Sequence, residues 1–145
     1  MNKLVPPSPI TTVAVSGGFD PIHKGHVRMI RAAAAFGEVI VIAISDEWLM
    51  RKKGYVFMPF EERAEILEGI KGVSAVVKAS DDDETVCATL RDLRPTSFAN
   101  GGDRKDDNVP EVALCKELGI KMLWNVGGDK IQSSSWLVEK SKEKR

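Results

Sequence analysis

The two histidines of the chain, His23 and His26, stand three residues apart in the segment GGFDPIHKGH at residues 17–26. Imidazole rings donate hydrogen bonds near neutral pH, so two of them in one place suit the stabilisation of anionic oxygens. The glycines allow close approach of the backbone, and a helix that follows would present N–H groups at its N-terminus. The segment therefore predicts a phosphate site.

The segment matches neither of the two common glycine-rich motifs. It is not a Walker loop, because no Gly-Lys-Ser/Thr follows the glycines, and it lacks the G-x-G-x-x-G dinucleotide fingerprint. Two other interpretations of the histidines stay open at this point. One histidine could cap a helix while the other is exposed. The pair could also bind a metal from positions i and i+3, although no third ligand stands nearby in the sequence.

Length and charge narrow the class of protein. The chain has 145 residues, with 21 Lys and Arg against 21 Asp and Glu. This length fits a single domain over residues 1–145, with residues 1–9 and 143–145 expected to be loose. The balanced charge argues against a sequence-independent nucleic-acid binder. Cys87 and Cys115 form no C-x-x-C motif and indicate a reducing compartment, although one disulfide stays open.

No segment has the composition of a membrane anchor or a signal peptide. The longest apolar run, at residues 39–44, is far shorter than the ~20 residues that a membrane-spanning helix needs. Residues 1–12 contain three prolines and no apolar run of signal-peptide length. We therefore expect a cytoplasmic protein with no membrane partner.

The elements that must position the histidines are expected to alternate between strand and helix. Apolar and β-branched runs predict strands at residues 10–15, 39–45, 73–77, 96–99 and 120–126. Helical spacing and caps predict helices at residues 24–36, 59–70, 84–94, 108–118 and 133–142. This order predicts a doubly wound, Rossmann-like α/β domain with five parallel strands. Ligands bind such sheets at the carboxyl ends of the strands, where the segment 17–26 begins.

The H-x-G-H sequence after a Gly-x-Phe-Asp strand exit resembles the nucleotidyltransferase superfamily. Within it, the chain is similar to the small cytidylyltransferase-like branch, which includes glycerol-3-phosphate cytidylyltransferases and heptose-phosphate adenylyltransferases. The likeness extends over nearly the whole chain. It includes Ile44-Ser45-Asp46 with the basic residues 51–53, Pro59-Phe60-Glu61-Glu62-Arg63, Asn100-Gly101-Gly102-Asp103 and Ser133-Ser134-Ser135.

The resemblance implies roles for individual residues. His23 and His26 would donate N–H groups to phosphate oxygens, Lys53 would neutralise phosphates from a flexible loop, and Arg63 would add a second cation. Asp20 would contact the acceptor. The nucleotide-binding residues would be Gly17, Gly18, Phe19, Gly25, Asn100, Gly102, Asp103, Ser133, Ser134 and Ser135. Read without the resemblance, Lys52 and Lys53 fit a solvated charge run, Arg63 a surface position, and the serines a helix cap.

The reaction implied by the resemblance moves a nucleoside monophosphate from CTP or ATP to a small phosphorylated alcohol or sugar, of the glycerol-3-phosphate or heptose-phosphate type, and releases pyrophosphate. Mg²⁺ would accompany the triphosphate, held mainly by the phosphates and not by a protein metal site. Related enzymes commonly pair, which implies a homodimer.

One departure from the family pattern leaves two points open. Residues 128–132 read GDKIQ where glycerol-phosphate enzymes carry Arg-Thr-x-Gly-Ile, so an arginine is missing. The choice between CTP and ATP therefore stays open. A non-catalytic nucleotide-binding sensor or subunit on the same fold also stays open as the alternative function.

Overall fold

The computed structural model describes residues 10–101, 110–128 and 134–143. Its sheet has the strand order β3-β2-β1-β4-β5, with every pairing parallel. The strands are β1 (Thr12–Gly17), β2 (Glu38–Ala43), β3 (Val73–Lys78), β4 (Ser97–Ala99) and β5 (Lys121–Leu123). The predicted doubly wound, five-stranded parallel sheet is confirmed. The central strand β1 runs two residues further than predicted, through Gly17.

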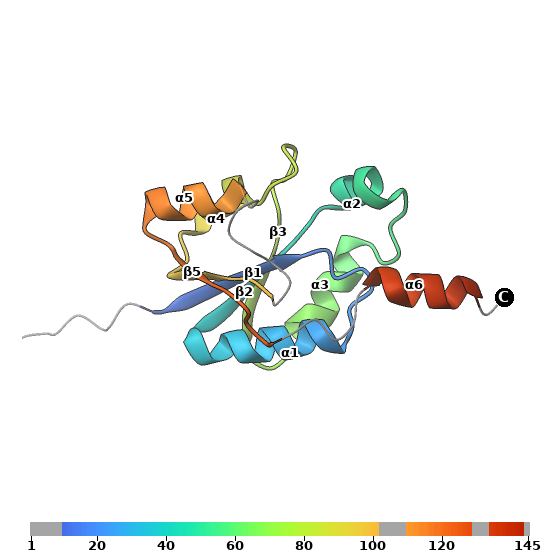
Figure 1. Cartoon of the computed structure of the whole chain (residues 1–145), viewed down its shortest axis with the longest axis horizontal. Coiled ribbons are helices and arrows are strands. Elements are labelled where there is room, and N and C mark those ends of the chain that lie inside the picture. Colours follow the sequence, from blue (N-terminus) through green and yellow to red (C-terminus); the bar gives the residue numbers. More distant parts are fainter. Residues whose placement is uncertain (1–9, 102–109, 129–133, 144–145) are drawn as a thin grey trace, which may run out of the picture.

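Helices cover both faces of the sheet (Figure 1). They are α1 (Lys24–Ala33) and α3 (Phe60–Glu68) on one face, and α4 (Cys87–Leu93) and α5 (Pro110–Leu118) on the other. Along β1, Val13 and Val15 pack toward the first pair of helices, whereas Ala14 packs toward the second. The middle of the strand, Val13 to Val15, is apolar because both of its faces are buried there.

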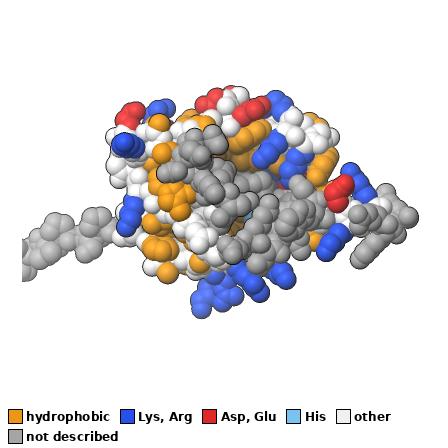
Figure 2. Space-filling view, viewed as in Figure 1, with side chains coloured by type: hydrophobic (Ala, Val, Ile, Leu, Met, Phe, Trp, Pro, Cys, Tyr) orange, Lys and Arg blue, Asp and Glu red, His pale blue; other side chains and the backbone are white. Residues whose placement is uncertain are grey.

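The helix α1 follows the histidine segment and ends in a short 3-10 turn, Ala34–Phe36. Gly37 then turns the chain into β2 with a φ of 152°, and a Cβ there would lie 2.6 Å from the carbonyl oxygen of Thr11. Only glycine fits such an approach. Lys24, Arg28 and Arg31 of α1 are exposed. Figure 2 shows basic side chains gathered along the lower edge of the molecule.

The segment after β2, for which the sequence predicts neither a strand nor a helix, is the helix α2 (Asp46–Lys53). Its start is capped by Ser45, whose side chain accepts a hydrogen bond from the N–H of Trp48 at 3.1 Å. Its end is closed by Gly54 in the left-handed region, with a φ of 84°. Acidic residues in the first turn and basic residues in the last turn complement the helix dipole.

Two further boundaries differ from the predictions. Helix α4 begins at Cys87 and not near residue 84, because Glu84 has a φ of 61° and Asp83 accepts hydrogen bonds from Thr85 instead of leading into a helix. Strand β5 spans only Lys121–Leu123 of the predicted residues 120–126. The last helix, α6 (Ser134–Glu143), extends beyond the carboxyl ends of the strands (Figure 1). Among the described residues, no helix has the length and apolar character to cross a membrane.

Candidate active site

The two histidines form a reciprocal cap at the start of α1. The Nδ1 atom of His23 accepts a hydrogen bond from the N–H of Gly25 at 3.1 Å, and Nδ1 of His26 accepts one from the N–H of His23 at 3.2 Å. The rings stack with centroids 3.8 Å apart and an interplanar angle of 24°. Because both Nδ1 atoms are acceptors, each neutral ring carries its proton on Nε2.

The environment of His26 keeps its ring neutral. The ring packs against the edge of the buried Phe19 side chain, with centroids 4.8 Å apart. Burial, with smaller contributions from the charges of His23 and Lys53, lowers the pKa of His26 to about 3. Near neutral pH this ring is therefore a hydrogen-bond donor and not a cation.

Lys53 brings a positive charge to the same place. It is the last residue of α2, and its ammonium Nζ lies 3.5 Å from the carbonyl oxygen of Asp20. Burial lowers the pKa of Lys53, whereas the charge of Asp20 acts in the opposite direction. The structure thus brings His23, His26 and Lys53 together, with Lys53 on a helix and not on the expected flexible loop. The neighbouring Lys52 lies over the ring of Trp48, with its Nζ 5.9 Å from the centroid.

Asp20, the expected contact to the acceptor, makes hydrogen bonds within the protein. Its side chain is fully buried, and its carboxylate accepts hydrogen bonds from the N–H groups of Phe57, at 2.7 Å, and Met58. The carboxylate therefore holds the segment between α2 and α3 against the exit of β1. Asp20 thus has a structural role, and its contact with the acceptor stays a prediction.

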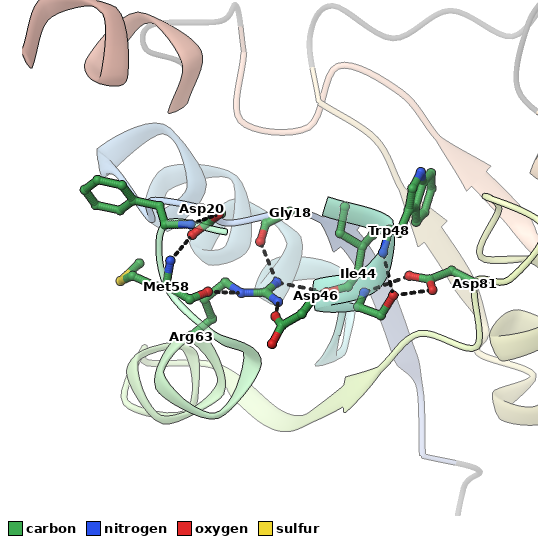
Figure 3. Close-up of polar contacts among 10 residues, drawn as sticks. Gly18, Asp20, Ile44, Asp46, Trp48, Met58, Arg63 and Asp81 are labelled. Carbon is green, nitrogen blue, oxygen red and sulfur yellow. Dashed lines mark hydrogen bonds and ion pairs between the residues drawn. The ribbon is translucent and has the colours of Figure 1, made fainter. Parts of the chain in front are cut away.

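Arg63 is not the surface residue that the sequence alone allowed, and its contact with a substrate stays a prediction. Its side chain is fully buried at the centre of a polar cluster (Figure 3). Its Nη1 donates to the carbonyl oxygens of Gly18, at 2.8 Å, and Ile44, at 2.9 Å. Its Nε donates to the carbonyl oxygen of Met58 at 2.9 Å, and its Nη2 pairs with Asp46 at 2.6 Å. Arg63 therefore joins the exits of β1 and β2 to the segment before α3.

Two acidic residues with positioning roles were missed in the sequence. Asp46 is the ion-pair partner of Arg63, and Asp81 accepts hydrogen bonds from both the N–H, at 2.7 Å, and the hydroxyl, at 2.5 Å, of Ser45. Ser45 in turn caps α2, so Asp81 fixes the start of the helix that carries Lys53 (Figure 3). The Ser-Asp-Glu sequence at residues 45–47 is a helix-start signal that could have predicted the cap.

The residues at the exit of β1 that are expected to bind nucleotide largely contact other residues of the protein. A Cβ at Gly17 would lie 3.2 Å from the ring of Phe19, and one at Gly18 would lie 3.3 Å from the side chain of Leu49. These glycines therefore make room for neighbouring side chains. The N–H of Gly25 serves the cap of His23, and Phe19 is a core residue that supports His26. The direct contacts of Phe19 and Gly25 with nucleotide stay predictions beside these internal contacts.

At the far side of β1, Asn100 follows β4 directly. Its side chain is 5% exposed, and its amide nitrogen Nδ2 has no hydrogen-bond partner among the residues that the structure describes. The expected contacts Gly102, Asp103 and Ser133 lie outside the described residues. Ser134 and Ser135 begin α6, but their side chains lie outside the description.

The described carboxylates at the site do not form a metal centre. Asp20 is engaged with two backbone N–H groups and Asp46 with Arg63. Across residues 10–101, 110–128 and 134–143, no group of three His, Cys, Asp or Glu side chains is placed to hold a metal ion. These residues do not fit a metal held by the protein itself.

Comparison with known proteins identifies several that are similar to this chain in sequence. The chain is 32% identical over 115 residues to D-beta-D-heptose 1-phosphate adenylyltransferase of Bordetella bronchiseptica, covering 77% of this chain and 70% of that one. It is 35% identical over 112 residues to FAD synthase of Pyrococcus horikoshii, covering 76% and 75%. It is also 34% identical over 112 residues to the bifunctional protein HldE of Streptomyces coelicolor, covering 75% of this chain but only 24% of that protein's length.

The fold has a matching solved structure. The lipopolysaccharide core biosynthesis protein of Thermoplasma volcanium superposes with a TM-score of 0.65 at 22% identity, over 79% of this chain and 93% of that one. The family model described as cytidylyltransferase-like matches residues 14–143. That range contains the stacked histidines, Lys53 and the buried Arg63. The chain belongs to the cytidylyltransferase-like family, as the H-x-G-H segment indicated.

Proposed function

We propose that the protein is a nucleotidyltransferase that transfers a nucleoside monophosphate from a nucleoside triphosphate to a small phosphorylated acceptor. The observation that carries this proposal is the pairing of the stacked histidines with Lys53. Two Nε2–H donors and one ammonium at one strand exit suit the oxygens of a polyphosphate. The exposed cations of α1 add to the positive potential around the site.

The chemistry needs no covalent intermediate on the protein. An oxygen of the acceptor's phosphate attacks the α-phosphorus of the triphosphate and forms a new P–O bond. The bond between the α-phosphorus and its bridging oxygen breaks, and the electron pair leaves with pyrophosphate. The protein positions the two substrates and stabilises the charge that builds on the phosphate oxygens. His23, His26 and Lys53 are the groups proposed for that task.

ATP is the favoured nucleotide, because the Bordetella relative is named an adenylyltransferase; CTP remains the second choice. A sugar phosphate of the heptose type is the first acceptor to test, followed by glycerol-3-phosphate and flavin mononucleotide, the last suggested by the FAD synthase relatives. Mg²⁺ would arrive with the triphosphate and be held by its phosphates, since the carboxylates described near the histidines are engaged elsewhere.

The test is pyrophosphate release by the full chain with each triphosphate, Mg²⁺ and each phosphorylated acceptor. We expect release that depends on both substrates. A chain that binds a triphosphate but releases no pyrophosphate with any of these acceptors would favour the binding-only alternative. A thermal-shift series with ATP, CTP, GTP and UTP ranks the bases, because a preferred ligand stabilises the fold by mass action.

A further inference from the structure

A small cleft lies between helix α6 and the segment that joins α2 to α3. Its volume is about 210 Å³, and it is lined by Pro21, Phe57, Leu137, Val138, Ser141 and Lys142. None of these side chains belongs to the proposed phosphate site. Pockets that enclose a whole drug-sized ligand begin at roughly 300 Å³, so this cleft has room for one part of a ligand.

The two walls of the cleft come from different elements. Residues 137, 138, 141 and 142 recur at helical spacing and therefore share one face of α6. Phe57 belongs to the other wall. Its backbone N–H donates to the buried carboxylate of Asp20 at 2.7 Å, while the residue as a whole is 58% exposed. An aromatic ring whose backbone is fixed and whose surface is open is available for packing against a ligand.

The cleft borders the proposed phosphate site. Pro21 stands two residues before His23, a span of at most about 7 Å of chain. The Nζ atom of Lys53 lies 3.5 Å from the carbonyl oxygen of Asp20, the residue before Pro21. In Figure 1, α6 lies beyond the carboxyl ends of the strands, next to the segment that leads into α1. A ligand whose phosphate meets these groups therefore has the cleft within reach of its other end.

The lining determines which chemistry the cleft suits. Among the described residues that line it, most are apolar, none is acidic, and Ser141 and Lys142 are the polar ones. A sugar would leave most of its hydroxyl groups without hydrogen-bond partners on such a surface, which weakens binding. A flat aromatic group packs against Phe57 without that penalty. The positive charge of Lys142 favours a ligand that is anionic elsewhere.

We propose that this cleft binds the part of the acceptor that is not phosphate, that this part is a flat aromatic group, and that Phe57 is a specificity-determining residue for it. The inference rests on the proposed nucleotidyltransferase function and ranks an aromatic phosphate above a sugar phosphate as the acceptor. The aromatic group lies between Phe57 and the lining face of α6. The acceptor's phosphate, at the other end of the molecule, remains the attacking group.

The experiment measures the binding of flavin mononucleotide to the full chain through the change in flavin fluorescence, so no turnover is needed. This probe joins a flat aromatic ring to a phosphate monoester. Riboflavin has the same ring without the phosphate, and glycerol-3-phosphate, measured by calorimetry, has the phosphate without a ring. We expect flavin mononucleotide to bind at least about tenfold more tightly than glycerol-3-phosphate, because the ring buries apolar surface.

Phe57→Ala tests one wall of the cleft, and Phe36→Ala is its matched control. Phe36 is also an exposed aromatic residue, at 48%, but it lies in the 3-10 turn after α1 and outside the cleft lining. We expect Phe57→Ala to weaken the binding of flavin mononucleotide and of riboflavin by about tenfold. Its affinity for glycerol-3-phosphate, and all affinities of Phe36→Ala, should stay within about twofold of the wild type.

Val138→Asp tests the other wall by placing a carboxylate inside the cleft. Lys140→Asp is the control, because it changes the charge of α6 by more but lies outside the lining. We expect Val138→Asp to weaken the binding of flavin mononucleotide by about tenfold, through burial of a charge and repulsion of the phosphate. Lys140→Asp should stay within about threefold, as for an exposed charge. Melting temperatures confirm that each variant is folded.

Three results would overturn the inference. They are flavin mononucleotide binding no more tightly than glycerol-3-phosphate, Phe57→Ala losing no more affinity than Phe36→Ala, or Phe57→Ala losing affinity for glycerol-3-phosphate equally. Pyrophosphate release with a sugar phosphate but not with flavin mononucleotide would support the proposed function and contradict this inference. Binding of flavin mononucleotide through Phe57 without any pyrophosphate release would contradict the proposed function and leave the aromatic cleft supported.

Discussion

His23 and His26 hold each other in place: the Nδ1 atom of His26 accepts from the backbone N–H of His23 at 3.2 Å, and the two rings stack 3.8 Å apart. The cap and the proposed donor pair are thus the same two side chains. The two earlier interpretations, a capping histidine and a phosphate site, do not exclude one another. Variants can separate them, because each role uses a different nitrogen of the ring.

The first prediction distinguishes the helix-capping role of His23 from its proposed role as a hydrogen-bond donor to phosphate. Asparagine is a good N-cap whose oxygen can replace Nδ1, but it has nothing at the position of Nε2. We expect His23→Asn to keep its unfolding free energy within about 0.5 kcal/mol of the wild type and to lose ~10²-fold in turnover. His23→Ala should lose turnover equally and also about 1 kcal/mol of stability. Chemical denaturation and pyrophosphate release measure the two effects. Wild-type turnover in His23→Asn would reject the donor role.

The second prediction concerns stability at acid pH. The pKa of His26 is about 3 in the folded protein against 6.5 for an ordinary histidine, so between these values the unfolded chain binds the extra proton. The unfolding free energy should therefore fall as the pH drops from about 6.5 toward 3, by up to about 1.4 kcal/mol per pH unit from this group. Denaturation of the wild type and His26→Asn across this range compares the slopes. Equal slopes would show that His26 does not cause the loss.

The third prediction concerns Lys53 and alkaline pH. Its charged form holds phosphate, so nucleotide affinity is full below the pKa of Lys53 and is lost as the pH rises through it. Because burial lowers that pKa, the loss should begin at a lower pH than for an ordinary lysine. Lys53→Arg should keep its affinity to higher pH, and Lys53→Ala should bind about tenfold more weakly or worse at neutral pH.

The control for Lys53 is Lys52→Ala, since Lys52 is exposed and lies over Trp48. Titration calorimetry with the preferred triphosphate at a series of pH values measures all three variants. If Lys52→Ala weakens binding as much as Lys53→Ala, the two lysines act as a general charge run and the specific placement of Lys53 carries no weight.

The fourth prediction assigns Arg63 to positioning. Arg63→Ala leaves three carbonyl oxygens and the half-exposed Asp46 without the buried guanidinium that serves them, so it should cost about 3 kcal/mol of unfolding free energy. Arg51→Ala is the control, because its pair with Glu84 is exposed at both ends and should contribute less than about 1 kcal/mol. Urea denaturation without ligand checks both values. If the Arg63→Ala protein is as stable as the wild type but inactive, the result contradicts the positioning role and supports a direct catalytic role for Arg63.

The fifth prediction tests the structural role of Asp20. Asparagine can accept from only one of the N–H groups of Phe57 and Met58, and its NH₂ would face the other. Asp20→Asn should therefore lose about 1–3 kcal/mol of stability. Unchanged stability together with a higher KM for the acceptor alone would contradict the structural role and support a contact between Asp20 and the acceptor.

The order of strands and helices could be predicted from the sequence because the sheet is buried on both faces. Runs such as residues 39–44 are continuously apolar for that reason, and each is followed by a segment with helical spacing. Helix α2 was missed because Leu49 is its one buried residue, so it has little apolar periodicity. Its caps at Ser45 and Gly54 define it instead.

The site was predicted best where its residues are close in sequence. The spacing of His23 and His26 is enough to place both rings at one helix start, whatever the rest of the fold does. The burial of Asp20 and Arg63 could not be predicted, because their partners lie up to 45 residues away and a charged residue gives no sign in the sequence that such partners will bury it. Only the packing of α3 beneath the exits of β1 and β2 makes Arg63 an internal residue.

Helix α2 is anchored at both ends, by the Asp81–Ser45 contact before it and by the hold of Asp20 on Phe57 and Met58 after it. Lys53 therefore lies on a helix whose two ends are fixed, so the chain loses little conformational entropy when a polyphosphate binds. An engineer who wishes to change the acceptor should leave these anchors intact. The exposed aromatic ring of Phe57, whose backbone is fixed while its side chain faces solvent, offers a safer place to introduce new contacts.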